Sequence, residues 1–185
     1  MKKEYNISVF SEHKVGILHR INVIFSRRKI NIESLNSSES ELRGIYRFTI
    51  VIQATEAMAR VVTKQIEKQI GILKAFYHTL DEIVYQEIAL YKVPTVAFAN
   101  GDEVESLIRK HNARILTIEP EYTVVEKTGH KEETRQLFRD LEPYGILQFA
   151  RSGRIALTKQ IKEISAYLKE IDAHHEVTAN DTVTY

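Results

Sequence analysis

The order of strand-like and helix-like segments restricts the fold of this 185-residue chain more than any other feature. Polar and apolar residues alternate over 4–10, apolar residues recur every three or four positions over 15–29, and a β-branched and aromatic run covers 45–52. The other elements of this half are a strand beginning within 30–35, a helix over 55–69 and a strand over 72–80. The resulting order, strand, helix, strand, strand, helix, strand, predicts a ferredoxin-like unit with both helices on one face of a four-stranded antiparallel sheet.

The second half of the chain repeats this order of elements without repeating the residues. The predicted elements are a strand over 88–93, a helix through Val104 and Ile108, strands over 113–118 and 122–126, a helix over 130–141, and a strand over 146–157 interrupted at Ser152 and Gly153. We therefore predict an α+β chain of two ferredoxin-like βαββαβ domains, residues 1–82 and 83–158. A helical extension with a polar tail, 159–185, follows, and its amphipathic part covers 159–171.

Each such sheet has one face without helices, and an exposed sheet face of this size needs a cover. We expect a second copy of the same domain to cover that face in the first unit. A homodimer formed through the N-terminal domains is the arrangement that this expectation predicts.

Charge and cysteine content limit the partners of the chain. Twenty-six Lys and Arg balance twenty-five Asp and Glu, so no strong field favours nucleic acid or a membrane surface. The absence of cysteine excludes disulfides, thiolate nucleophiles and cysteine metal sites, and no run approaches the length of a membrane span. We expect a cytoplasmic protein that binds neither nucleic acid nor membrane.

The sequence carries no recognisable catalytic motif. It has no glycine-rich phosphate loop, no nucleophile elbow and no metal-ligand spacing, and the adjacent His174 and His175 do not make a metal pair. We therefore predict no catalytic residue, no metal site and no cofactor bound by this chain.

A candidate ligand site lies at the start of the first predicted helix. Gly16 permits close approach to the backbone, and the amides that follow it, at Ile17 and Leu18, are unpaired donors at the positive end of the helix dipole. A carboxylate fits this position, while Asn31, after the helix, offers an amide and a carbonyl for the charged groups of a free amino acid. The alternatives from the residues alone are an ordinary tight loop at Gly16 and a turn residue at Asn31.

The same residues resemble a known family. The segments Gly16-Ile17-Leu18, Ile24-Phe25-Ser26-Arg27-Arg28 and Asn31-Ile32-Glu33-Ser34-Leu35 are similar to the N-terminal ACT domain of the acetolactate synthase small subunit. Further similarity covers Glu87-Ile88-Ala89-Leu90-Tyr91-Lys92-Val93, Thr128-Gly129, Phe138, Leu141, Pro143, Gly145-Ile146 and Ala150-Arg151-Ser152-Gly153 with Leu157. The resemblance extends over about residues 4–157.

The resemblance implies a noncatalytic regulatory subunit. Such a subunit activates the acetolactate synthase catalytic subunit, which carries thiamine diphosphate, Mg and FAD, and mediates feedback inhibition by a branched-chain amino acid, typically valine. The implied effector site contains His13, Val15, Gly16, Ile17, Leu18, Asn31 and Ile32, and it lies between the ACT domains of two copies. His13 occupies a loop position where valine-sensitive members commonly carry an asparagine, so which amino acid binds stays open. His13 itself is either a ligand contact, stronger when protonated, or a solvated loop histidine.

The second half carries one more candidate surface. Arg151, Ser152, Gly153 and Arg154 form a basic, glycine-interrupted strand end, which is either a contact with the catalytic subunit or a plain bulge. Two other functions remain as alternatives to the regulatory subunit. One is a freestanding ACT-type amino-acid sensor that acts on another enzyme or on transcription, and the other is an enzyme in its own right.

Overall fold

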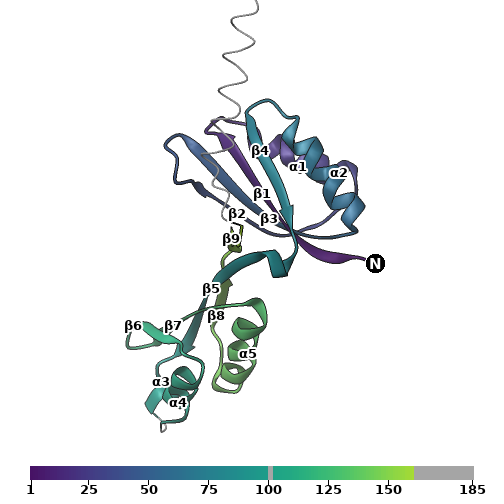
Figure 1. Cartoon of the computed structure of the whole chain (residues 1–185). Coiled ribbons are helices and arrows are strands. Elements are labelled where there is room, and N and C mark those ends of the chain that lie inside the picture. Colours follow the sequence, from purple (N-terminus) through teal and green to yellow (C-terminus); the bar gives the residue numbers. More distant parts are fainter. Residues whose placement is uncertain (100–101, 161–185) are drawn as a thin grey trace, which may run out of the picture.

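The structure, a computed structural model, describes residues 1–99 and 102–160. Two α+β units follow each other along this part of the chain, and Figure 1 shows strand β5 leading from one into the other. The predicted class of two ferredoxin-like units is confirmed. The predicted helix over 159–171 and the polar tail, with His174 and His175, lie outside the described residues from 161 onward.

The first unit is an antiparallel sheet in the order β2-β3-β1-β4, with two helices on one face. Its elements are β1 (Lys3–Glu12), α1 (Ile17–Arg27), β2 (Ile32–Glu39), β3 (Ile45–Ala54), α2 (Glu56–Glu67) and β4 (Ile72–His78). Helix α1 buries Ile21, Ile24 and Phe25, as their spacing predicts, together with Ile17. The predicted stripe also contained Val15 and Leu18, but Val15 precedes the helix and Leu18 is 42% exposed. Helix α2 begins after Thr55, whose hydroxyl accepts the Met58 amide at 3.3 Å, which confirms the predicted cap.

The second unit has the corresponding strand order, β6-β7-β5-β8, and its own core. A short 3-10 helix, η1 (Leu80–Glu82), precedes it. Its elements are β5 (Ile83–Pro94), α3 (Val96–Ala99), α4 (Glu103–Lys110), β6 (Arg114–Ile118), β7 (Tyr122–Gly129), α5 (Lys131–Leu141), η2 (Glu142–Tyr144), β8 (Gln148–Arg151) and β9 (Ile155–Thr158). Tyr91 and Val93 of β5 pack against Val104, Leu137 and Leu141 of the helices, all fully buried.

Strand β2 is longer than the sequence pattern predicts. The polar residues Asn36, Ser38 and Glu39 continue the strand instead of loosening it, because β3 pairs with them throughout. Asn36 lies opposite Thr49 and Ser38 opposite Arg47, so polar side chains meet across the two strands on the face without helices. Cross-strand pairing here outweighs the low strand propensity of Asn and Ser.

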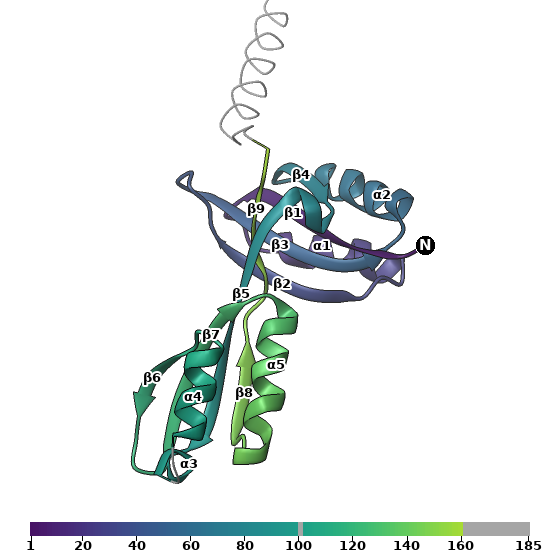
Figure 2. The ribbon, with the colours of Figure 1, turned by 60° about the horizontal axis from the view of Figure 1, so that its bottom comes forward.

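Strand β5 begins five residues before the predicted strand. It takes part in two structures, a two-stranded ribbon with β9 and the sheet of the second unit. Residues 83–86 pair with β9, and residues 87–94 pair with β7 in the second sheet (Figure 2). The two-stranded β5–β9 ribbon lies on the helix-free face of the first sheet, where Asn6 is 0% and Thr49 4% exposed. We expected a second copy of the domain to cover this face. That expectation is wrong for the centre of the face, because the β5–β9 ribbon of the same chain covers the centre.

A buried ionic cluster holds the two units together. Arg154 is 2% exposed, and its guanidinium lies 2.8 Å from the Glu4 carboxylate of β1 and 3.7 Å from the Glu87 carboxylate of β5. The guanidinium also stacks 4.0 Å above the Tyr85 ring, and Arg151 approaches Glu87 at 3.3 Å. These contacts join the first strand of one unit to the first strand of the other.

Gly153 lets the chain pass directly over strand β2. A Cβ atom at this position would overlap the backbone carbonyl of Leu35, and the next amide, of Arg154, donates to the Ser34 hydroxyl at 3.0 Å. The close approach therefore requires a residue without a side chain. The glycine that interrupts the last predicted strand fixes the height of the ribbon above the sheet.

We predict that Gly153→Ala lowers the free energy of unfolding by about 1–3 kcal/mol, because the added methyl group forces β9 away from Leu35. Urea denaturation measures this loss of stability. Hydrogen exchange should increase more at the β9 amides than in the sheet β2-β3-β1-β4. Gly44→Ala is the control: its Cβ meets nothing within 4 Å, and the positive φ of 78° should cost only about 1 kcal/mol without changing exchange in β9. Wild-type stability and exchange in Gly153→Ala would contradict the proposed packing.

Candidate functional site

The loop of residues 13–16 leads from β1 into α1 and is exposed along its whole length. Gly16 is the N-cap residue of α1 in the left-handed conformation, with φ 86° and ψ −4°, and it provides no capping side chain. The first turn of α1 contains no acidic residue. The amides of this turn therefore have no intrahelical acceptor, and no carboxylate on the turn offsets the positive end of the helix dipole.

The space around these amides is open. A Cβ atom built on Gly16 would meet nothing within 4 Å, so an anion has room to approach the backbone. Ile17 is 2% exposed, so its side chain anchors the start of the helix in the core. The arrangement can bind a carboxylate through backbone donors.

Apolar and aromatic groups border the same loop. Val15 is 102% and Leu18 42% exposed, so both offer apolar surface beside the amides. The His13 ring stacks on Tyr46 with 4.1 Å between ring centroids and 8° between planes, while its amide donates to the Gly44 carbonyl at 3.2 Å. His13 is therefore held at the rim of the loop by Tyr46 and Gly44.

The structure separates Asn31 and Ile32 from this loop within one chain. Ile32 lies beside Ile52, which pairs with Tyr5, whereas the loop follows Glu12 at the other end of β1. At roughly 3.3 Å per residue along β1, the two positions are about 23 Å apart, far more than the length of a free amino acid. A single copy cannot bring both to one ligand, and the predicted site therefore needs Asn31 from a second copy.

The predicted partner-contact segment has a role within the chain. Arg154 is buried in the ionic cluster, Gly153 packs on Leu35, and the Ser152 hydroxyl accepts the Ile88 amide at 2.9 Å. The Nε atom of Arg151 lies 3.3 Å from the Glu87 carboxylate. The segment is neither a free basic surface nor a plain bulge, because it connects the units, and its contact with a catalytic subunit stays a prediction.

No catalytic or ligand-binding motif marks Glu4, Glu87 and Arg47 in the sequence, although Glu87 begins a segment that resembles the family. Glu87 occupies a core position in the alternation of β5, between Tyr85 and Ala89, and such a position is a signal of a paired buried charge. Arg47 likewise interrupts the most strand-like run of the chain. Periodicity identifies both positions, whereas their partners come from the fold.

No helix in residues 1–99 and 102–160 combines the length and the apolar character needed to cross a membrane. In the same residues, no group of three or more His, Cys, Asp or Glu side chains is placed to hold a metal ion.

Comparison with known proteins assigns both halves of the chain to one family. Residues 7–74 match the sequence model of the AHAS small subunit-like ACT domain, and residues 86–160 match that of the small subunit of acetolactate synthase. A solved structure of the acetolactate synthase small subunit from Thermotoga maritima superposes with a TM-score of 0.78 at 24% identity. The superposition covers 86% of this chain and 99% of that chain, which shows the same fold.

Curated relatives match this chain over nearly their whole length. The acetolactate synthase small subunit of Mycobacterium bovis is 35% identical over 157 residues, which are 85% of this chain and 93% of that protein. The acetolactate synthase small subunit of Bacillus subtilis is 32% identical over 172 residues, 92% of this chain and 98% of that protein. The matches in sequence and fold therefore show that this chain belongs to the acetolactate synthase small-subunit family.

Proposed function

We propose that this chain is the noncatalytic regulatory subunit of acetolactate synthase, which activates the thiamine-diphosphate-dependent catalytic subunit and carries feedback inhibition by a branched-chain amino acid. The geometric observation that supports the inhibitory site is the open start of α1. Its unpaired amides at Gly16, Ile17 and Leu18 suit the carboxylate of an effector, and the exposed Val15 and Leu18 suit an aliphatic side chain.

The effector site forms between two copies of the chain. Residues 13–18 come from one copy, and Asn31 with Ile32 come from the other, because one copy keeps these segments apart. Asn31 offers its side-chain carbonyl to the ammonium group of the effector. Binding then stabilises one arrangement of the two ACT domains over others, which is a population shift.

The second unit passes this shift to the catalytic subunit. Strand β5 is shared by the ribbon on the first sheet and by the second sheet, and Arg154 ties β1 to β5 through Glu4 and Glu87. A change in the first sheet therefore moves the second unit as a body rather than through a loose linker. The coupling free energy between effector and catalytic subunit is carried by this junction.

Reconstitution with the catalytic subunit from the same organism tests the function. We predict that adding this chain raises the rate of acetolactate formation, and that valine, leucine or isoleucine lowers the raised rate towards that of the catalytic subunit alone. An unchanged rate on adding the chain would contradict the regulatory role and would favour a freestanding sensor.

We predict that Gly16→Asp abolishes inhibition by the amino acid while activation persists. The new carboxylate repels that of the effector, yet the fold tolerates it, because the position is open and Asp accepts the left-handed conformation better than most residues. Gly16→Asn is the matched neutral control and should retain inhibition. Inhibition of Gly16→Asp at wild-type effector concentrations would show that the site lies elsewhere.

Mixing two variants that do not bind the effector tests whether the site is shared between copies. Neither Gly16→Asp nor Asn31→Ala alone should bind the effector, but each mixed pair should contain one site with both native segments. Random exchange of chains should restore about a quarter of the sites, measured by effector binding. If both residues served a site within one chain, mixing would restore none.

A further inference from the structure

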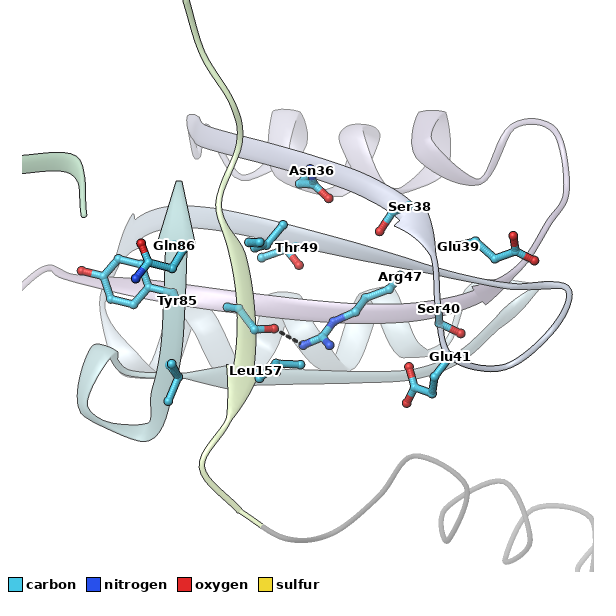
Figure 3. Close-up of a pocket in the computed structure, with 13 residues that line it drawn as sticks. Asn36, Ser38, Glu39, Ser40, Glu41, Arg47, Thr49, Tyr85, Gln86 and Leu157 are labelled. Carbon is cyan, nitrogen blue, oxygen red and sulfur yellow. Dashed lines mark hydrogen bonds between the residues drawn. The ribbon is translucent and has the colours of Figure 1, made fainter. Parts of the chain in front are cut away.

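A cavity lies between the two units, on the face of the first sheet opposite α1. It has a volume of about 360 Å³, near the lower end of the range for small-molecule sites. Strands β2 and β3 form its floor, residues 39–41 form one side, and the β5–β9 ribbon crosses it (Figure 3). Because the sheet separates it from α1, this cavity is distinct from the loop of residues 13–18.

Arg47 brings a poorly compensated positive charge to this cavity. Its Nη2 donates to the carbonyl of Ala156 and, at 3.4 Å, to the hydroxyl of Ser8, which are both neutral acceptors. Its Nε has no partner, and among the described residues no carboxylate lies within 4.0 Å of the guanidinium. Burial lowers the pKa of Arg47, and the Glu41 carboxylate only partly opposes this effect. A partly buried cation whose contacts are neutral acceptors and the Phe10 ring, with 5.3 Å between the guanidinium carbon and the ring centroid, favours binding of an anion.

Apolar side chains from the ribbon line the same cavity and remain exposed. Val84 is 60%, Ile155 53% and Leu157 65% exposed. Burying such groups against an aliphatic chain is favourable, at about 25 cal/mol per Å² of apolar surface. The cavity therefore combines an anion-binding group with an apolar wall.

The remaining lining residues define the ligand more closely. Ser38 offers a hydroxyl group beside Arg47, whereas the Ser40 hydroxyl is bonded to the Leu42 backbone, and the Glu41 carboxylate lies at the hairpin end (Figure 3). We infer that this cavity binds an aliphatic amino acid as a zwitterion. Its carboxylate pairs with Arg47, its ammonium group faces Glu41, and its side chain lies on Val84 and Leu157.

A ligand in this position contacts both units at once. It touches β2 and β3 of the first sheet and the ribbon that continues into the second unit. Binding therefore favours the arrangement in which the ribbon lies over the sheet, and it fixes the second unit relative to the first. This inference does not depend on the effector site of the proposed function, because it uses other residues on another face.

Methyl NMR of the full chain tests the inference by reporting which site a ligand occupies. The probes are leucine, valine and isoleucine, with serine as the polar control and 4-methyl-2-oxopentanoate as the leucine analogue without an ammonium group. We predict saturable shifts of the Val84, Ile155 and Leu157 methyls with the aliphatic amino acids, at least tenfold weaker binding of the oxo acid, and none with serine. These shifts should persist in Gly16→Asp, which removes only the loop site.

Two variants test the role of the cavity residues. Arg47→Met should weaken binding at these methyls about tenfold or more, because it removes the charged donor, whereas Arg43→Met, outside the cavity, should bind as the wild type. Leu157→Glu should also abolish binding, and since Leu157 is 65% exposed this variant keeps the fold even if Arg47→Met does not. Leu116→Glu, at a residue that is 52% exposed outside the cavity, is its control. The methyls of Val125 and Leu137 report that the second core stays intact.

Several results would overturn the inference. One is the absence of saturable shifts at about 10 mM amino acid, tenfold above a dissociation constant of ~1 mM. Others are shifts confined to Val15 and Leu18, and wild-type binding by both Arg47→Met and Leu157→Glu. Oxo acid binding as tight as that of leucine would overturn the zwitterion assignment. Failure of reconstituted activation would refute the proposed function and leave these binding results unchanged.

Discussion

The arrangement of the two units depends on one buried cation. Arg154 is 2% exposed and is held between Glu4 and Glu87 over the ring of Tyr85. Removing a charged side chain from water is costly, and here the cost is met by two carboxylates that come from different units. Separating the units would take the Glu4 carboxylate away from Arg154 and leave the guanidinium only the longer 3.7 Å contact with Glu87, so the ionic cluster opposes separation of the units.

The ribbon built on this cluster changes the meaning of the helix-free sheet face. Asn6, Ser8 and Thr49 are polar and at most 4% exposed, a composition that suits the backbone and polar groups of a crossing ribbon better than a second hydrophobic layer. The ribbon leaves its own outer side chains exposed, including Val84 and Leu157. The interdomain cavity is a consequence, since the ribbon covers the centre of the face but not the end beside residues 39–41.

The same construction explains how binding of a ligand to the first unit would affect the position of the second unit. Strand β5 belongs to both layers, and no flexible linker intervenes between residue 86, paired with β9, and residue 87, paired with β7. In the proposed regulatory subunit, an effector at the loop of residues 13–18 acts on one face of the first sheet and a ligand in the cavity acts on the other. Both would bias the position of the second unit through the same strand.

The sequence by itself determined the elements, because apolar periodicity and glycine positions are local properties. Alternation identified β1, a β-branched and aromatic run identified β3, three- and four-residue spacing identified α1 and α2, and Gly16 marked the start of α1 correctly. The similarity of Asn31 and its neighbours to a family placed the chain among small subunits before any geometry. Tertiary structure alone decided which elements cover which face, how far apart Gly16 and Asn31 lie, and that Arg154 pairs inside the chain. Those outcomes depend on contacts between residues distant in sequence, such as Glu4 with Arg154, and no local pattern encodes the partner of a buried charge.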